Sequence, residues 1–275
     1  MRFWKYHGIG NDFVLLDNFD GNADKDPAWV TAVCDRRFGI GADGILYLER
    51  SEKADATMSI LNSDGSVAEM CGNGIRCVAK HLYDFGIVKS KHMTIDTLAG
   101  TKTIECSVTG GQVTDVKVGM GAAVLECDKV PMRCQGKFID SVLEVGGSQI
   151  RGTAVSMGNP HFITFQSFTD QEQERLAPLI QSNDSFPKKT NVEFVKSSNG
   201  VLSVKVLERG AGWTMACGTG ACATAVAAAL QGLAPYEKEI EVRLPGGSLW
   251  ISVAKDLGSV TMRGPAARVF QGEME

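Results

Sequence analysis

The chain contains the sequence Cys-Gly-x-Gly twice, and each copy presents a thiol on a glycine-rich turn. The first copy begins at Cys71 and the second at Cys217, 146 residues later. The flanking residues keep the same offset, so that Leu61 corresponds to Leu207 and Asn62 to Glu208. A repeated register of this kind indicates an internal duplication. If the two halves fold alike and face each other, two thiols meet at one cleft. Opposed acid/base groups are what the inversion of a carbon centre by proton transfer requires.

Each cysteine comes directly before a predicted helix, which decides its chemistry. Residues 75–85 have apolar side chains on one helical face and stop at Gly86, and a second helix is expected over about 221–230. At a helix start, unpaired N–H groups and the macrodipole favour an anion. We therefore expect this position to lower the thiol pKa from its ordinary value of about 8.5. The same N–H groups can bind a carboxylate, and the glycines let a substrate approach the backbone.

Two further residues are candidates for acid/base work beside the thiols. Glu208 lies nine residues before Cys217, just as Asn62 lies nine residues before Cys71. An acid and an amide should therefore project at equivalent places in the two halves. His161, on the predicted turn 158–161, could exchange a proton with a nearby thiol. A Glu-Arg pair is usually a surface feature and a lone histidine is usually structural, but the duplicated site favours catalysis for both.

The two predicted central helices differ in polarity. The helix after Cys217 is almost entirely alanine and other small residues, so it must be buried, with a sheet wrapped around it. The corresponding helix of the first half carries Arg76, Lys80 and His81, and we expect it to be less enclosed. A third helix should begin after the Asp26-Pro27 cap, and an exposed charged helix should cover 169–181. Strands are expected over 13–17, 45–49, 56–61, 154–157, 162–165, 192–195 and 202–207.

The composition is that of an ordinary globular protein. The chain has 275 residues, of which 22% are charged, and a net charge of −4. This balance gives no electrostatic reason to expect a nucleic-acid or anionic-membrane partner. The N-terminus lacks the apolar segment of a signal peptide and no apolar run is long enough for a membrane span, so a cytoplasmic location is expected. The length allows two domains, and the duplication favours two.

Eight cysteines raise the alternatives of a disulfide scaffold or a metal site. The chain length and the N-terminus argue against the first. The absence of CxxC spacing or Cys/His clusters argues against the second, so no metal is expected. The six cysteines outside the repeated sequence are best explained as small hydrophobic residues or incidental thiols: Cys34, Cys77, Cys106, Cys127, Cys134 and Cys222.

Over essentially its whole length the chain resembles the diaminopimelate epimerase family. The matching segments include 7–13, 62–66, 70–77, 156–161, 208–212, 216–222 and 244–247, together with Asn191 before Phe194. The resemblance implies an α/β (α+β) fold with two pseudo-symmetric domains. In each, a mixed, mostly antiparallel sheet rolls around a central helix. We expect the domains to cover 1–118 plus 263–275, bearing Cys71, and 119–262, bearing Cys217, and we expect a homodimer.

The implied reaction interconverts LL- and meso-diaminopimelate, a small-molecule substrate of lysine and cell-wall precursor biosynthesis, without a cofactor. One cysteine, as a thiolate, takes the α-proton, and the other, as a thiol, protonates the opposite face. Carried over by motif, the acid/base groups are Cys71 and Cys217, assisted by His161 and Glu208. The reacting carboxylate would lie at Gly72-Asn73 and Gly218-Thr219. The distal end would contact Asn11, Asn62, Asn159, Asn191 and Arg209, with Glu208 also at the substrate.

Two positions depart from the commoner family pattern. Gly44 stands where many members carry glutamine, and Trp213 stands where small or polar residues are commoner. Two other functions remain open. A two-cysteine racemase of the proline racemase type would share the fold and chemistry, although a proline ring would not need Arg209 and several asparagines. A binding protein that holds phosphate or carboxylate without chemistry would leave both cysteines unexplained.

Overall fold

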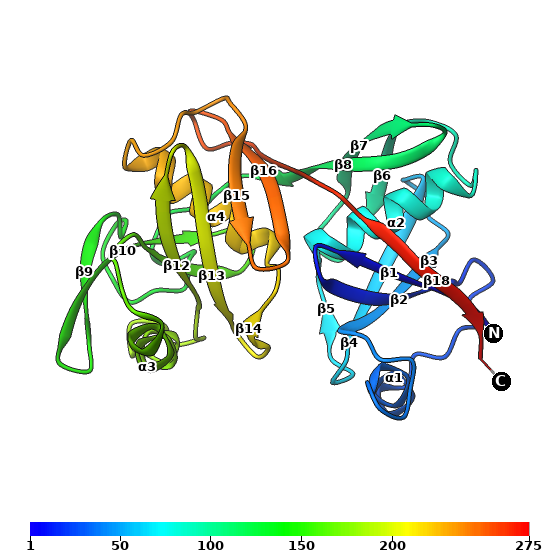
Figure 1. Cartoon of the computed structure of the whole chain (residues 1–275), viewed down its shortest axis with the longest axis horizontal. Coiled ribbons are helices and arrows are strands. Elements are labelled where there is room, and N and C mark those ends of the chain that lie inside the picture. The colour runs from blue at the N-terminus through cyan, green and yellow to red at the C-terminus, as the bar shows by residue number, and fades with distance from the viewer. Residues whose placement is uncertain (275) are drawn as a thin grey trace. The chain divides into compact units, whose positions relative to one another are not determined.

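The computed structural model describes residues 1–274 and divides into two compact units (Figure 1). Unit 1 comprises residues 1–119 and 263–275, and unit 2 comprises residues 120–262. The predicted boundary after residue 118 lies one residue before the observed one. Each cysteine of the repeated sequence belongs to a different unit.

Unit 1 is built from a sheet, a short outer helix and one long helix. Its elements are β1 (Arg2–Gly8), β2 (Asn11–Asp17), α1 (Pro27–Cys34), β3 (Gly44–Glu49), β4 (Ala56–Asn62), β5 (Val67–Ala68), α2 (Gly72–Asp84), β6 (His92–Asp96), β7 (Lys102–Thr109), β8 (Gln112–Gly121) and β18 (Ala267–Glu273). The last strand, β18, pairs antiparallel with β1, so the end of the chain returns to unit 1.

Unit 2 repeats this plan. Its elements are β9 (Ser141–Val145), β10 (Ser148–Ser156), β11 (Pro160–Thr164), α3 (Asp170–Gln181), β12 (Asn191–Ser198), β13 (Val201–Glu208), β14 (Gly212–Thr214), α4 (Gly218–Leu230), β15 (Ile240–Leu244), β16 (Gly247–Val253) and β17 (Val260–Gly264). The first helix of each unit begins at a side-chain cap. Asp26 accepts hydrogen bonds from the first turn of α1, and Thr169 forms a capping box with Glu172 of α3.

Both units have mixed sheets in which antiparallel pairing predominates, which confirms the predicted fold class. In unit 1 the parallel pairs are β2–β3 and β4–β6. In unit 2 they are β11–β12 and β13–β15. Most other neighbours, such as β3–β4 and β12–β13, are antiparallel.

The duplication is visible in the pairing register. In unit 1, Ile60 of β4 faces Ala68 of β5, and in unit 2, Val206 of β13 faces Thr214 of β14. Both pairs are related by the offset of 146 residues that relates the two cysteines. The helices α2 and α4 have 13 residues each and begin one residue after their cysteine. The order strand, turn, short strand, cysteine, helix therefore occurs once in each unit.

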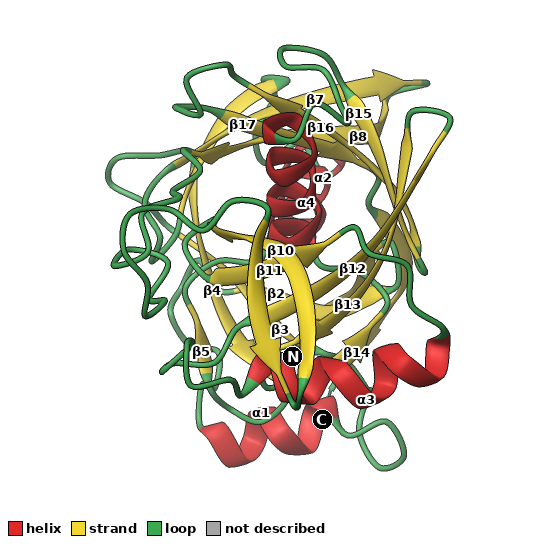
Figure 2. Cartoon of the chain, turned by 90° about the vertical axis from the view of Figure 1, so that its left-hand side faces the viewer, coloured by secondary structure: helices red, strands yellow, loops and turns green. Residues whose placement is uncertain are grey.

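Helix α4 lies inside the curved strands of unit 2, as its composition predicts (Figure 2). Its residues from Gly220 to Ala229 are all buried, and it packs against β10, β13 and β16. Small side chains allow this close approach, because they let strands surround the helix without leaving gaps.

The prediction that α2 is less enclosed is wrong. Residues 72–82 of α2 are all buried, including Arg76 and His81 at 0% exposure. Their polar atoms are bonded within unit 1, which removes most of the penalty of burial. Lys80 contacts Asp84 at 2.7 Å and donates to the carbonyl of Val113 at 2.6 Å.

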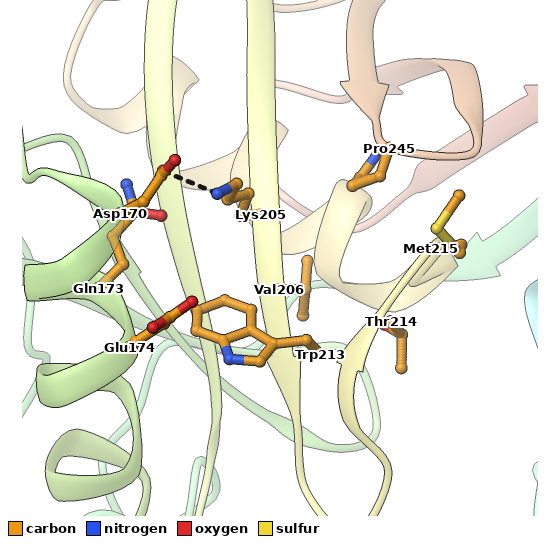
Figure 3. Close-up of a pocket in the computed structure, with 9 residues that line it drawn as sticks. All are labelled: Asp170, Gln173, Glu174, Lys205, Val206, Trp213, Thr214, Met215 and Pro245. Atoms are coloured by element: carbon orange, nitrogen blue, oxygen red, sulfur yellow. Dashed lines mark hydrogen bonds and ion pairs between the residues drawn. The ribbon is translucent and has the colours of Figure 1, made fainter.

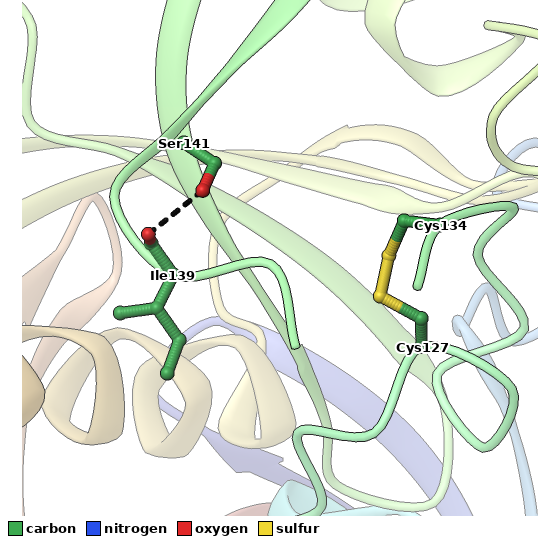
Figure 4. The surroundings of a disulfide bond; sticks show 4 residues. All are labelled: Cys127, Cys134, Ile139 and Ser141. Atoms are coloured by element: carbon green, nitrogen blue, oxygen red, sulfur yellow. Dashed lines mark hydrogen bonds between the residues drawn. A yellow bond between two sulfur atoms is a disulfide. The ribbon is translucent and has the colours of Figure 1, made fainter. Parts of the chain in front are cut away.

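The interpretation of Cys127 and Cys134 as small hydrophobic residues or incidental thiols is also wrong, because they form a disulfide (Figure 4). The intervening chain folds back in turns, with the amide of Met132 bonded to the carbonyl of Cys127. This brings the two Cα atoms to 5.7 Å, which lies within the ordinary range for a disulfide. Of the remaining cysteines, Cys34, Cys77, Cys106 and Cys222 are buried and are not part of a disulfide, which agrees with a packing role.

Candidate active site

Both cysteines of the repeated sequence cap a helix. Cys71 and Cys217 have extended backbone conformations and are the N-cap residues of α2 and α4. The amide of Gly74 donates to the Cys71 sulfur at 3.4 Å, and the amide of Gly220 donates to the Cys217 sulfur at 3.3 Å. Each sulfur therefore occupies the anion-favouring end of its helix, as the sequence predicts.

In unit 1, two asparagines of the predicted site lie beside Cys71. The Cys71 thiol donates to Asn11 Oδ1 at 3.6 Å, and Asn73 Nδ2 donates to the same oxygen at 3.0 Å. Asn11 is held from its other side, because its amide donates to Asp43 at 2.6 Å. Asn62 is different: its amide donates to Ser66 within its own turn at 3.0 Å.

Arg76 fixes the start of α2 from inside unit 1. Its guanidinium donates to the carbonyl of Gly72 at 2.9 Å, to Asn73 Oδ1 at 3.0 Å and to the carbonyl of Pro265 at 3.1 Å. The predicted site omitted Arg76 and Asp43. The signal available in the sequence was the position of Arg76, five residues after Cys71 and one helical turn after Gly72, from which an arginine can reach the helix start.

In unit 2, Glu208 lies beside Cys217. Thr214 Oγ1 donates to Glu208 Oε1 at 2.6 Å, which ties the end of β13 to the adjacent strand β14. Burial raises the pKa of the Cys217 thiol well above 9.0. The negative charges of Glu208 and Glu193 raise it further, as does its hydrogen bond with Glu208, while a contact with Thr219 lowers it. The expected lowering by the helix start is therefore overturned at Cys217, because desolvation and two carboxylates outweigh the helix end.

His161 lies on β11, not on a turn. Its side chain is fully buried, and its two ring nitrogens contact Glu193 Oε1 at 2.6 Å and Asn159 Oδ1 at 3.0 Å. Asn159 in turn donates to Thr219 Oγ1 at 3.3 Å, and Thr219 Oγ1 lies 3.6 Å from the Cys217 sulfur. Four predicted site residues are thus joined in one chain of contacts.

Sequence reasoning missed Glu193, the fully buried partner of His161. Burial raises its pKa; the charge and hydrogen bond of His161 oppose that shift, and the charge of Glu208 adds to it. An acidic residue in the otherwise apolar run Asn191-Val192-Glu193-Phe194-Val195 was the available signal, because buried acids are retained mostly where they are paired.

Asn191 and Arg209 are adjacent at the ends of β12 and β13. The buried Asn191 side chain accepts a hydrogen bond from the Arg209 amide at 2.7 Å. The exposed Arg209 guanidinium donates to the carbonyl of Lys188 at 3.0 Å, which uses one of its five N–H groups. The guanidinium group therefore has further N–H groups that can donate to a carboxylate.

The two departures from the family pattern have structural explanations. A side chain at Gly44 would place its Cβ only 2.6 Å from the carbonyl oxygen of Leu61 on the paired strand β4, so there is no room for one at this position. Trp213 packs against Phe194 with ring centroids 6.3 Å apart, and it remains 43% exposed.

Trp213 also lines a surface cavity of about 340 Å³ in unit 2, against α3 (Figure 3). The rim carries the Asp170–Lys205 ion pair at 2.8 Å, and no predicted site residue lines the cavity. Among the described residues, Gln173 Oε1 has no hydrogen-bond partner, and it is shielded from solvent. Within residues 1–274, no cluster of three potential metal ligands occurs, and no helix is long and apolar enough to cross a membrane.

Comparison with solved structures identifies the fold. A probable proline racemase from Agrobacterium radiobacter K84 matches with a TM-score of 0.71 at 15% identity, covering 100% of this chain and 92% of the other. A PhzF-family protein from Bacillus anthracis matches with a TM-score of 0.72 at 17% identity, covering 100% and 99%. These similarities establish the two-unit fold found in racemases and phenazine biosynthesis proteins.

Sequence comparison is more specific. The family model described as diaminopimelate epimerase matches residues 3–126 and 153–269. The protein named diaminopimelate epimerase from Desulfitobacterium hafniense is 48% identical, covering 99% of this chain and 97% of its own length. Another from Methanococcus maripaludis is 41% identical, covering 100% of both. The chain belongs to the diaminopimelate epimerase family, and it is an isomerase.

Proposed function

We propose that this protein interconverts LL- and meso-diaminopimelate by two-base proton transfer, with Cys71 and Cys217 as the acid/base pair. The observation that carries the proposal is the matched geometry of the two sulfurs. Each accepts a backbone N–H bond at a helix start, in units related by one offset. A thiolate on one face removes the α-proton, and a thiol on the other delivers a proton to the carbanion. One turnover leaves the protonation states of the two cysteines exchanged.

The raised pKa of Cys217 favours the starting form in which Cys217 is the protonated thiol. In the direction of reaction that starts from this form, Cys217 donates the proton and Cys71 is the base, and the reverse reaction exchanges these roles. The proposed roles of Glu208 and His161 follow from their places beside Cys217. Glu208 opposes loss of the proton from the sulfur before substrate binds, and His161 begins the chain of contacts that reaches Thr219.

Binding is proposed to use the two helix starts and the asparagines. The amides at Gly72-Asn73 and Gly218-Thr219 suit a carboxylate, since helix starts bind anions. The free N–H groups of Arg209 suit the distal carboxylate, since a guanidinium pairs with it in a planar fork. The amides of Asn11, Asn62, Asn159 and Asn191 provide both donors and acceptors for the ammonium groups and the carboxylates.

Exchange of the substrate α-proton with deuterated solvent tests this proposal. NMR of LL-diaminopimelate in D₂O should show catalysed epimerisation and incorporation of deuterium at the inverted centre. Cys71→Ala and Cys217→Ala should each abolish epimerisation while the circular dichroism spectrum stays unchanged. Cys222→Ala is the matched control, because this thiol is buried in α4 one turn beyond Gly218. Epimerisation by either site variant at more than a small fraction of the normal rate contradicts the two-base reaction.

We also propose that the protein forms a homodimer and that it is located in the cytoplasm. The support for both is membership in a family whose named relatives act on a small biosynthetic amino acid. Sedimentation equilibrium tests the first, where a single species of monomer mass contradicts it. Fractionation of the source cells, followed by detection of the protein, tests the second.

A further inference from the structure

A fully buried carboxylate, that of Glu193, lies beside both His161 and Cys217. Strands β11 and β12 run parallel with Ile163 opposite Glu193, which places the carboxyl group next to the His161 ring. Glu193 Oε1 contacts His161 Nδ1 at 2.6 Å, and both side chains are 0% exposed. A Cβ built on Gly220 would lie 2.8 Å from Glu193 Oε1 and 3.2 Å from the Cys217 sulfur. The carboxyl group and the sulfur therefore flank the same point at the start of α4.

The contacts between His161 and Cys217 have a single direction. Asn159 donates its Nδ2 to Thr219 Oγ1, so its Oδ1 is the acceptor that faces His161 Nε2. An amide oxygen only accepts, and Nε2 must therefore carry a proton. Because Thr219 Oγ1 already accepts from Asn159, its own hydrogen is available for the Cys217 sulfur. With Thr219 as the donor to the sulfur, the donors all point from His161 toward the cysteine.

The second carboxyl oxygen of Glu193 indicates which of the two residues, His161 or Glu193, carries the proton between them. Glu193 Oε2 is buried and has no hydrogen-bond partner in the described chain. A buried carboxylate with an unpaired oxygen is costly, whereas a neutral carboxylic acid tolerates one far better. The charged or titratable groups that face Glu193 are His161 from β11, Glu208 from β13 and Cys217 at the start of α4. Near Glu208, a neutral Glu193 also avoids a second negative charge close to the first.

We propose that Glu193, as a neutral acid, is a positioning residue that holds His161 as the tautomer protonated on Nε2. The histidine, Asn159 and Thr219 then form a one-way series of donors that ends on the Cys217 sulfur. When Cys217 gives its proton to the substrate carbanion, the new thiolate receives hydrogen bonds from Thr219 and from the amide of Gly220. No proton leaves the series, and the reverse transfer restores the thiol. The link to catalysis rests on the proposed function, but the tautomer does not.

Two substitutions separate positioning from bulk packing. In Glu193→Gln the amide nitrogen can donate to His161 Nδ1 and maintain the Nε2–H tautomer, as a neutral acid does. Glu193→Leu has a similar size but no donor. We expect the Gln variant to keep kcat within about threefold. The Leu variant should lose roughly 10- to 100-fold in kcat with little change in KM, as when other residues that orient a functional histidine are removed.

The direct readout is the ¹⁵N NMR spectrum of the histidine ring nitrogens, with His161 assigned by comparison with His161→Gln. The wild type and Glu193→Gln should show a proton on Nε2 and none on Nδ1, whereas Glu193→Leu should show a mixture of tautomers. This readout is independent of turnover, so it holds or fails separately from the epimerase proposal. A wild-type ring protonated on both nitrogens or on Nδ1 alone overturns the inference. So does a Leu variant with the wild-type tautomer and kcat, or a Gln variant as impaired as Leu.

Discussion

The two glycines that follow the cysteines by three residues provide a matched test of the site. Gly74 and Gly220 occupy the same position in α2 and α4, and neither has the left-handed backbone that excludes a side chain. Substitution of either by alanine should therefore add about 0.5–1 kcal/mol to helix stability in the absence of other contacts. What the new methyl group meets differs between the two units.

At Gly74 the new Cβ meets a flexible partner. It would lie 2.8 Å from Cδ2 of Leu46, the far end of a side chain that can rotate, and 3.5 Å from the Cβ of Cys71, an ordinary contact. The helix gain and the cost of moving Leu46 should nearly cancel. We expect Gly74→Ala to change the free energy of unfolding by less than about 0.5 kcal/mol, because the helix gain offsets the cost of displacing Leu46.

A Cβ introduced at Gly220 would lie among the residues of the proposed active site. It would lie 2.8 Å from Glu193 Oε1, which is held in a 2.6 Å bond to His161, and 3.2 Å from the Cys217 sulfur. Forcing a methyl group into a packed interior costs about 1–3 kcal/mol. After the helix gain is deducted, Gly220→Ala should destabilise the protein by about 0.5–2 kcal/mol. Displacement of the sulfur by even part of an ångström should reduce kcat by roughly 10- to 100-fold.

Urea unfolding followed by circular dichroism, together with the rate of LL-diaminopimelate epimerisation, measures both effects. The double variant Gly220→Ala, Glu193→Ala should be more stable than the sum of the single effects, because removal of the carboxyl group makes room for the methyl group. If Gly74→Ala reduced stability and activity as much as Gly220→Ala, or more, this would refute the inference that the new methyl group is crowded by Cys217 and Glu193.

Two further predictions concern substrate choice and pH. Arg209→Lys should lose most of the activity. The wild-type kcat/KM for L-lysine should be lower than that for LL-diaminopimelate by roughly 10⁴-fold, since a site built for a second carboxylate rejects an analogue without one. Comparable kcat/KM values for the two substrates, or a preference for L-proline, would favour the proline racemase type. Because the folded-state pKa of Cys217 is raised above 9.0, the stability it contributes is complete below pH 9.0 and is lost as the pH rises through the folded pKa. Relative to Cys217→Ser, the wild type should lose up to about 1.4 kcal/mol of unfolding free energy per pH unit above 9, and parallel urea-denaturation curves for the two proteins between pH 8 and 11 would contradict this.

The sequence carries the local parts of this site because they depend on neighbours along the chain. The pattern Cys-Gly-x-Gly before an apolar periodic segment is enough to place a thiol at a helix start, and the structure has both sulfurs there. The alanine-rich composition of α4 likewise predicts its burial, since a helix without a polar face has no surface to present to water.

Other features depend on which strands become neighbours, and composition misleads about them. Arg76, Lys80 and His81 predict that α2 is less enclosed, yet all three are buried, because β1, β8 and the returning C-terminal segment supply partners. The pairing of Cys127 with Cys134 depends on a turn whose closure is not encoded by cysteine spacing alone.

The acid/base properties of the site are the part that only the tertiary structure decides. The helix start alone predicts a lowered pKa for Cys217, but folding buries the sulfur and brings Glu193 and Glu208 to it from two different strands. His161 and Glu193 are 32 residues apart and meet because β11 pairs in parallel with β12. The sequence by itself determines where each thiol stands on its helix. Its protonation depends on desolvation and on charges that approach from distant segments, and these exist only once the chain has folded.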